Sequence, residues 1–294
     1  DNVKSNSIAC GLNEILTYSF VSQRGVDKIN LPADDEKRNF VKIMNPLGEE
    51  TSVMRTTLIP NMLDVISTNI SHKVEEVSAF ECGNTFIPQE GLPIETKKYC
   101  VGMYGKEVDF FVLKGVIESV LNNVGLKGYE IEPETTNLTF HPGRCAKIVY
   151  NNIYIGTFGE LHPDVIENYN LGQRVYLAEL DLDLIFDNSD RTIIYNPLPK
   201  YPSTSRDIAL IVKDEVFVKQ IEDIIKANGE DLVESYKLFD VYKGAQIEEG
   251  HKSIAYSITY RSKDKTLTDE DVAKVHEKIL SELSEKLNAN LRSN

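Results

Sequence analysis

In three segments before residue 196, hydrophobic residues recur every three or four positions, which is the spacing of an amphipathic helix. Their hydrophobic positions are Ile8, Leu12, Ile15 and Leu16; Met62, Val65 and Ile66; and Phe110, Leu113, Ile117, Val120, Leu121 and Val124. Pro60 stands where the first turn of the second helix tolerates proline. Gly125 follows the third segment, as is common at a helix C-cap. The pattern therefore predicts three helices in this region.

Strand-like hydrophobic runs lie between and after these helices. They are Thr17–Phe20, Val77–Phe80, Ala146–Tyr150, Tyr154–Phe158 and Val175–Leu184. Helices interspersed with such runs predict an α+β domain built on a largely antiparallel sheet.

A proline-rich stretch ends this part of the chain. Pro197, Pro199 and Pro202 fall within six residues, and proline continues neither a helix nor a central strand. We therefore predict a stiff linker over residues 196–202, between a first domain over residues 1–195 and a second over residues 203–294.

The second domain is predicted to have the order β-α-β-β-α-β, which is the ferredoxin-like arrangement. Its strands are expected at Ile208–Val212, Lys237–Tyr242, Ser253–Tyr260 and near Asn288–Arg292. One helix is marked by Phe217, Ile221, Ile224 and Ile225, and the other by Val272, Val275, Ile279 and Leu283. Thr268 and Asp271 have the spacing of a capping box at the start of the second helix.

The third strand of this domain alternates between two kinds of side chain. One face carries Ile254, Tyr256, Ile258 and Tyr260, and the other carries Ser253, Ala255, Ser257 and Thr259. Successive side chains of a strand point to opposite faces, so the first set should pack on the helices. The second set predicts an open sheet face that is suited to docking.

Composition and charge narrow the functional classes. The 294 residues are 41% hydrophobic and 27% charged, and no stretch approaches the ~18 apolar residues of a membrane span, so no membrane partner is expected. The net charge is −14, of which −11 falls in residues 1–198 and −3 from Pro199 onward. A negative field opposes bulk electrostatic binding of nucleic acid. Any such contact is therefore expected to be local and to lie in the second domain.

The cysteines indicate a reducing compartment. Cys10, Cys82, Cys100 and Cys145 are scattered, with no Cys-x-x-Cys pair and no histidine at metal-ligand spacing. This pattern favours buried, reduced thiols over a disulfide framework or a zinc site. We therefore predict no metal site and a cytoplasmic location.

Short segments along nearly the whole chain give the strongest functional signal. In the first domain they are Gly11–Phe20, Asn45–Gly48, Met54–Pro60, Phe80–Phe86, His141–Arg144 and Gly156–Pro163. In the second they are Tyr201–Asp207, Leu238–Tyr242 and Glu249–Ser253. Each segment is weak alone, but the ordered set resembles the C-terminal region of the bacterial phenylalanyl-tRNA synthetase β subunit.

The resemblance implies a class II synthetase-like catalytic fold, degenerate in this subunit, followed by a ferredoxin-fold anticodon-binding domain. It implies a subunit that pairs with a catalytic α subunit in an (αβ)2 assembly, contacts tRNA-Phe and supports ATP-dependent attachment of phenylalanine. ATP and magnesium would then be used by the whole enzyme, with no cofactor held by this chain.

The residues themselves argue against catalysis. A class II site uses an arginine on its second motif to neutralise the α-phosphate of ATP, and here Ile87 stands where that arginine is expected. The chain also has no Gly-x-Gly turn and no Gly-x-x-x-x-Gly-Lys loop. We therefore predict no catalytic residue in this chain.

Other polar residues have simpler interpretations. Glu179, Asp181 and Asp183 alternate with leucines, so we expect them on one solvated strand face rather than around a cation. His141 and His162 each precede a proline and are expected to shape turns. Arg144 is expected to face the degenerate pocket or to form an internal salt bridge.

Two sets of residues are candidates for binding. For the interface with the α subunit the candidates are Met62, Val65, Ile66, Phe110, Leu113 and Ile117, with burial in the chain's own core as the alternative. For tRNA the candidates are Tyr242, which would stack on an unpaired base, and Arg206, Lys243, Lys252 and Arg261, which would contact phosphates. The alternative for this second set is an ordinary surface.

Two other functions stay open at this point. One is a repurposed paralogue that acts as a regulatory or tRNA-binding adaptor. The other is a ligase active alone on a small carboxylic acid, which Ile87 argues against.

Overall fold

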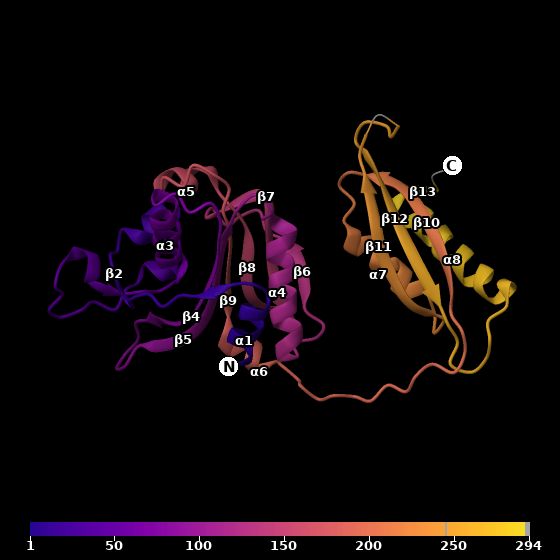
Figure 1. Ribbon diagram of the computed structural model, residues 1–294, viewed down its shortest axis with the longest axis horizontal. Helices are drawn as coiled ribbons and strands as arrows, with labels where there is room; N and C mark the ends of the chain where they lie inside the picture. The colour runs from indigo at the N-terminus through magenta and orange to yellow at the C-terminus, as the bar shows by residue number, and fades with distance from the viewer. Residues whose placement is uncertain (245, 292–294) are drawn as a thin grey trace. The chain divides into compact units, whose positions relative to one another are not determined.

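The chain divides into two compact units, unit 1 (Asp1–Ile193) and unit 2 (Ile194–Asn294) (Figure 1). The computed structural model describes residues 1–244 and 246–291. Residues 189–203 form neither helix nor strand, and they include the three prolines of the predicted linker.

Unit 1 is built on a seven-stranded sheet with the order β1-β4-β5-β9-β8-β7-β6. Its strands are β1 (Asn13–Glu14), β4 (Val77–Ile87), β5 (Ile94–Tyr104), β6 (Glu130–Pro133), β7 (Phe140–Tyr150), β8 (Ile153–Leu161) and β9 (Tyr176–Asp181). β1 runs parallel to β4, and the other neighbouring pairs are antiparallel. A small separate sheet pairs β2 (Phe20–Val21) with β3 (Val53–Met54). The prediction of an α+β domain on a largely antiparallel sheet is confirmed.

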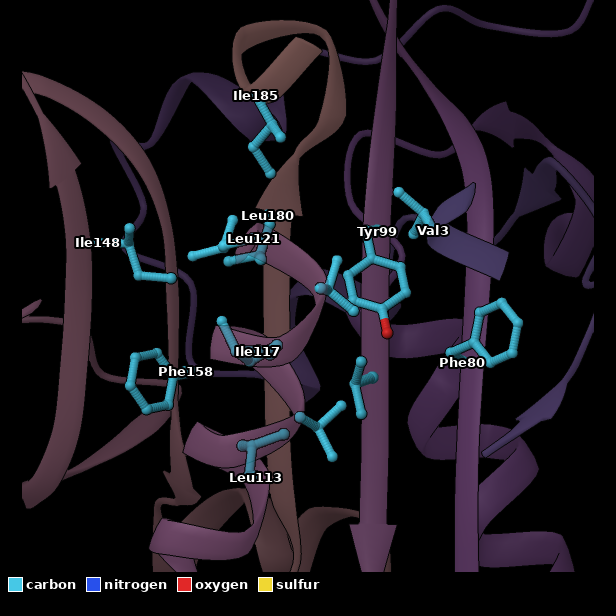
Figure 2. Packing of buried hydrophobic residues seen from close by; sticks show 14 of the residues in the cluster. Val3, Phe80, Tyr99, Leu113, Ile117, Leu121, Ile148, Phe158, Leu180 and Ile185 are labelled. Atoms are coloured by element: carbon cyan, nitrogen blue, oxygen red, sulfur yellow. The ribbon is translucent and has the colours of Figure 1, made fainter. Parts of the chain in front are cut away.

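Helices cover both faces of the large sheet. α1 (Asn2–Ala9), α4 (Phe110–Val124) and α6 (Leu182–Asp187) contribute to one hydrophobic core. α3 (Ile59–Ser71) and α5 (Pro163–Asn168) contribute to a second core. The chain before α3 also contains α2 (Gly25–Lys28) and two short 3-10 helices, η1 (Glu36–Arg38) and η2 (Glu49–Thr51). Figure 2 shows the first core, where α4 places Leu113, Ile117 and Leu121 among Tyr99, Phe158 and Leu180 of the sheet.

The helix α4 follows its hydrophobic spacing closely. Its N-terminus is capped by Asp109, whose side chain accepts a hydrogen bond from the backbone N–H of Val112. Its C-terminus is capped by Gly125 in the left-handed conformation, with φ of 86°. The predicted helix and its glycine cap are confirmed.

Replacing Gly125 by alanine is expected to lower the free energy of unfolding of unit 1 by about 1–3 kcal/mol. The residue has a positive φ, and an added Cβ would collide with the backbone carbonyl of Asp190. Urea denaturation followed by circular dichroism measures the loss. Gly128→Ala is the matched control, because Gly128 also has a positive φ but would place its Cβ in open space. Equal losses in the two variants would contradict the collision.

Two predicted elements of unit 1 end earlier than their patterns suggest. α1 stops at Ala9, because Gly11 has a φ of 87° that breaks the helix, and the stripe predicted through Leu16 is therefore wrong beyond that point. The strand predicted to Leu184 ends at Asp181. Asp181 is the N-cap of α6, and its side chain accepts a hydrogen bond from the N–H of Leu184. In both cases a backbone or capping interaction overrides the hydrophobic pattern.

Unit 2 is a four-stranded antiparallel sheet with the order β11-β12-β10-β13. Its strands are β10 (Thr204–Lys213), β11 (Val233–Tyr242), β12 (His251–Tyr260) and β13 (Asn290–Leu291), and its helices are α7 (Val218–Asn228) and α8 (Asp269–Leu287). The element order confirms the ferredoxin-like prediction. Thr268 and Asp271 form the predicted capping box of α8. Arg292, included in the last predicted strand, lies outside the described residues.

One face of this sheet packs on the two helices, as predicted. Its buried side chains include Ile254, Tyr256, Ile258 and Tyr260. The opposite face is less open than the sequence suggests, because Ser253 and Ala255 are buried. Ser253 lies between Ile211 of β10 and Tyr242 of β11, and these larger neighbours screen its small side chain.

Candidate functional site

The segment of β4 that resembles the second class II motif offers no cation to a nucleotide. Its last residue is Ile87, an apolar side chain at the end of the strand. The space above Gly83 is filled by the guanidinium group of Arg55, with which an added Cβ would collide. Arg55 is therefore engaged inside the protein.

Arg55 belongs to a buried network that joins three segments of unit 1. The Arg55 and Glu81 side chains are 4% and 0% exposed, and Arg55 Nη1 lies 2.9 Å from Glu81 Oε1. Arg55 also donates from Nη1 to Thr17 Oγ1 at 2.8 Å and from Nε to the carbonyl oxygen of Asn84 at 2.9 Å. Thr17 in turn donates from Oγ1 to Glu81 Oε2 at 2.7 Å. Each charge is therefore balanced by a close partner.

The three acidic residues Glu179, Asp181 and Asp183 do not share one solvated strand face, so that prediction is wrong. Glu179 accepts hydrogen bonds from Thr57 Oγ1 and from the N–H of Leu58, both at 2.7 Å, beside the N-terminus of α3. Asp181 pairs with Lys98 at 2.7 Å. Asp183 lies in α6 and accepts from a backbone N–H of β5. Each carboxylate has a structural role.

No group of three or more His, Cys, Asp or Glu side chains within residues 1–244 and 246–291 is placed to hold a metal ion. The thiols of Cys100 and Cys145 are buried, Cys10 and Cys82 are half-buried, and all four are free. Burial raises the pKa of Cys82 to about 11 and that of Cys145 to about 12, so these two thiols stay protonated at neutral pH.

The two histidines that precede prolines shape turns, as predicted. His141 Nδ1 accepts a hydrogen bond from the N–H of Gly143, and His162 Nδ1 accepts one from the N–H of Asp164 at the start of α5. Of the two alternatives for Arg144, the structure supports the internal salt bridge, since its Nη1 lies 2.7 Å from Glu160 Oε1.

Four of the six predicted interface residues are buried in the chain itself. Met62 and Ile66 fill one core, and Leu113 and Ile117 fill the other. For these four residues the interface prediction is corrected: none of their surface is exposed, so they pack the cores instead. Val65 is partly exposed and lines a cavity. Phe110 is also partly exposed, and its ring stacks on Phe158 with 5.2 Å between centroids.

One exposed apolar surface of unit 1 lies on the extended segment that follows β1 and ends at Phe20, the first residue of β2. Leu16 and Tyr18 are 86% and 84% exposed, and Phe20 is about half exposed. Together they form the apolar strip, whose side chains alternate with the more buried Ile15, Thr17 and Ser19. The strip borders a cavity of about 800 Å³ that also contacts Phe40 and α3. The hydrophobic spacing predicted Leu16 in a helix, so it did not indicate this surface.

A second exposed apolar pair lies on the loop before η2. Met44 and Leu47 are almost fully exposed. The loop is held by backbone hydrogen bonds from Ile43 to Ser52 and from Met54 to Val41. Both side chains therefore point away from the core of unit 1.

The five predicted tRNA contacts in unit 2 form two groups at opposite ends of the sheet. Arg206 and Arg261 lie near the end where Thr204 pairs with Tyr260. Lys243 and Lys252 lie near the end where Lys213 pairs with His251, and Tyr242 lies opposite Ser253 there. Arg206 and Lys213 are seven positions apart, which corresponds to about 23 Å of strand. Arg206 and Arg261 are therefore far from Tyr242 along the strands.

All four of these cations already have partners in the chain. Arg206 pairs with Asp269 and Arg261 with Glu234, while the ammonium of Lys243 lies 2.7 Å from Asp214 Oδ2. The Lys252 ammonium donates to the carbonyl oxygen of Asp214 at 2.9 Å, and burial lowers its pKa. A phosphate would have to compete with these internal contacts.

Arg206 and Tyr242 lie on different faces of the sheet. Arg206 lies opposite Ile258, on the face that packs against the helices, and it pairs with the first turn of α8. Tyr242 lies opposite Ser253, on the other face. A stacked base could therefore reach Tyr242, whereas Arg206 and Lys252, which lies opposite the buried Val212, are on the face that packs against the helices.

Comparisons with known proteins bear on both units. A family model described as the phenylalanyl tRNA synthetase beta chain CLM domain matches residues 1–182, which include all seven strands of the large sheet. The chain belongs to the phenylalanyl-tRNA synthetase β-chain family. A second model, described as a ferredoxin-fold anticodon binding domain, matches residues 199–292 and so includes the five predicted tRNA contacts.

The curated relatives of this β-chain family member include long proteins named phenylalanine–tRNA ligase beta subunit. The one from Clostridium acetobutylicum is 46% identical over 99% of this chain and 37% of the relative. Those from Moorella thermoacetica and Listeria monocytogenes are 38% and 37% identical, over 97% and 96% of this chain and 37% and 36% of the relatives. The chain thus spans a little over a third of the length of these relatives.

Within this β-chain family member, every helix of the described residues is too short or too polar to traverse a lipid bilayer.

Proposed function

We propose that this chain is the C-terminal, non-catalytic part of a phenylalanine–tRNA ligase β subunit. Unit 1 docks the catalytic α subunit in an (αβ)2 assembly, and unit 2 contacts the anticodon region of tRNA-Phe. The observation that carries the proposal is that both family models match in order and together include nearly the whole chain. The same match does not favour the alternative of a repurposed adaptor.

The architecture of unit 1 supports a class II synthetase-like fold. Six antiparallel strands with one parallel strand, β1, at the edge form a sheet with helices on both faces. Ile87 at the arginine position and the buried Arg55–Glu81 pair support a module without catalytic activity. ATP and magnesium are then used by the whole enzyme in the cytoplasm, and this chain acts by binding and orientation.

Association with the α subunit tests the proposal. We expect the chain and its cognate α subunit to co-elute in size-exclusion chromatography, with light scattering that gives two copies of each. No association at micromolar concentration would overturn the docking role of unit 1. The chain alone is expected to exchange no pyrophosphate into ATP, and such exchange would overturn its non-catalytic assignment.

Replacing Tyr242 by alanine is expected to weaken tRNA-Phe binding by the assembled enzyme by about 1–3 kcal/mol, because a stacked base loses its aromatic partner. Filter binding at fixed salt measures the change, and Tyr242→Phe, which keeps the ring, should bind normally. Arg206→Ala tests the opposite end of the sheet. A larger loss with Arg206→Ala than with Tyr242→Ala would move the contact to that end.

A further inference from the structure

A wide bulge interrupts the pairing of β7 with β8. Four residues of β7, 141–144, lie opposite the single residue Glu160 of β8. Phe140 and Cys145, which flank these four residues, are buried, so the bulge is fixed at both ends. Bulges redirect side chains and are over-represented next to functional sites. This one brings Arg144 to the surface beside Glu160, with Arg144 Nη1 2.7 Å from Glu160 Oε1.

A second arginine reaches the same carboxylate from the loop between α5 and β9. Leu171 and Val175 of this loop are buried, and they hold the exposed residues between them close to the sheet. Among these exposed residues is Arg174, whose Nε lies 3.7 Å from Glu160 Oε1. Arg144 contacts the same oxygen. Two arginines from separate segments therefore converge on one carboxylate oxygen.

The acidic member of this cluster is buried, and its two basic members are exposed. The Glu160 side chain is 8% exposed, whereas those of Arg144 and Arg174 are 44% and 67% exposed. The second oxygen, Glu160 Oε2, accepts a hydrogen bond from the Tyr176 hydroxyl at 3.2 Å. Two positive charges are thus set against one negative charge. A molecule that approaches from solvent meets the two guanidinium groups and not the carboxylate.

A phosphate group is the partner that this arrangement fits best. A guanidinium group presents its N–H donors as a planar fork that matches the oxygens of a phosphate. Both forks are attached to short segments with buried neighbours, so little conformational freedom is lost when an anion binds them.

The surroundings favour a backbone phosphate of RNA over a free anion. Small anions and other small ligands are usually held in an enclosing cavity, and neither Arg144 nor Arg174 lines the cavity beside the apolar strip. The net charge of residues 1–198 is −11, which opposes extended contact between unit 1 and a polyanion. A polynucleotide that touches this unit is therefore expected to do so at a local cluster of positive charge.

We infer that Arg144 and Arg174, which converge on Glu160, form a contact on unit 1 for one backbone phosphate of tRNA. The inference rests on the proposed function, in which the chain binds tRNA-Phe, and it adds a contact outside unit 2. It also departs from the charge-based expectation that nucleic-acid contacts lie in the second domain alone. Glu160 is buried and holds the two side chains together without meeting the RNA itself.

The variants Arg144→Gln and Arg174→Gln test this contact, because each removes one guanidinium group. Arg24→Gln is the matched control: Arg24 also lies in unit 1, is 76% exposed and pairs singly with the exposed Glu49. All three variants lower the charge of unit 1 equally, so the control corrects for bulk electrostatics. Filter binding of a tRNA-Phe transcript to the full chain is measured over a series of salt concentrations that starts at about 50 mM.

Arg144→Gln and Arg174→Gln are each expected to weaken transcript binding about tenfold. Each should also reduce the slope of log affinity against log salt by about 1, as the loss of one phosphate contact requires. Arg24→Gln should resemble the unsubstituted chain in both respects. Normal binding by both test variants would overturn the inference. An equal loss with Arg24→Gln would also overturn it, because bulk charge would then be the cause.

Inorganic phosphate is the second probe, and it distinguishes a free anion from the RNA backbone. The inference would be overturned if phosphate protected the chain from urea only when both arginines were present, while transcript binding did not depend on them. Such a result would assign the pair to a small anion.

Tyr242→Ala, measured in the same chain, separates this inference from the proposed function. A loss with Tyr242→Ala and none with the arginine variants would keep the proposed tRNA contact of unit 2 and reject the contact on unit 1. A loss with the arginine variants alone would do the reverse. If the unsubstituted chain does not bind the transcript even at the lowest salt, the inference fails, and the proposed function is then decided by the assembled enzyme.

Discussion

Replacing Arg55 by leucine is expected to lower the free energy of unfolding of unit 1 by about 3–5 kcal/mol, the largest single effect predicted for this chain. The substitution leaves the Glu81 carboxylate fully buried with no cation beside it. It also removes the donors to Thr17 Oγ1 and to the carbonyl oxygen of Asn84. The chain has 14 tyrosines and no tryptophan, so urea denaturation is best followed by circular dichroism.

Two further variants separate the buried charge from other causes of this loss. The double variant Arg55→Leu, Glu81→Leu removes both charges and should recover part of the stability, because no unpaired charge stays buried. Arg206→Leu removes a surface arginine that pairs with the exposed Asp269, and it should cost no more than about 1 kcal/mol. If Arg206→Leu and Arg55→Leu lowered stability equally, burial would not be the cause of the effect.

Local patterns were sufficient for much of the fold. The helix from Phe110 to Val124 has its apolar stripe, its aspartate cap and its terminal glycine in one continuous segment. The capping box of Thr268 and the alternation from Ser253 to Tyr260 are equally local. Where the residues that decide an element are neighbours in sequence, periodicity and capping rules identify the element.

The network around Arg55 lies beyond such rules. Thr17 and Arg55 are 38 residues apart, and Arg55 and Glu81 are 26 apart. No periodic pattern links residues at those separations, so the sequence indicated neither the pair nor the direction of the strip. The segments that resemble the synthetase β subunit include Thr17, Arg55 and Glu81. A resemblance in sequence, however, does not show which side chains are in contact.

The interface residues were misassigned for a different physical reason. A helical stripe shows that one side of a helix avoids water, but not whether the chain itself or a partner covers that side. In unit 1 both faces of the sheet are covered by the chain's own helices, so Met62 and Leu113 are buried without a partner. The exposed Leu16 and Tyr18 lie instead on the extended segment beside β1, where alternation rather than helical spacing was the relevant signal.

The double variant Leu16→Ala, Tyr18→Ala is expected to weaken association with the α subunit by at least about 3 kcal/mol, or more than a hundredfold. Both side chains are large and exposed in the isolated chain, so burying them against a partner is a main source of binding energy. The stability of the chain should change little, since exposed substitutions usually stay within about 0.5 kcal/mol. Titration calorimetry with the cognate α subunit measures the affinity.

The control for this variant is Phe111→Ala, which removes an exposed aromatic side chain from α4. α4 covers one face of the large sheet, whereas α3 and the cavity beside the apolar strip lie on the other face. If any exposed hydrophobic surface were sufficient for association, Phe111→Ala would weaken binding as much as the double variant. If the partner uses the apolar strip, Phe111→Ala should bind normally while the double variant does not. Normal binding by the double variant would place the docking surface elsewhere on unit 1. Met44 and Leu47 would then be the next residues to replace, because both are exposed and their loop pairs with β3, the strand that also pairs with Phe20.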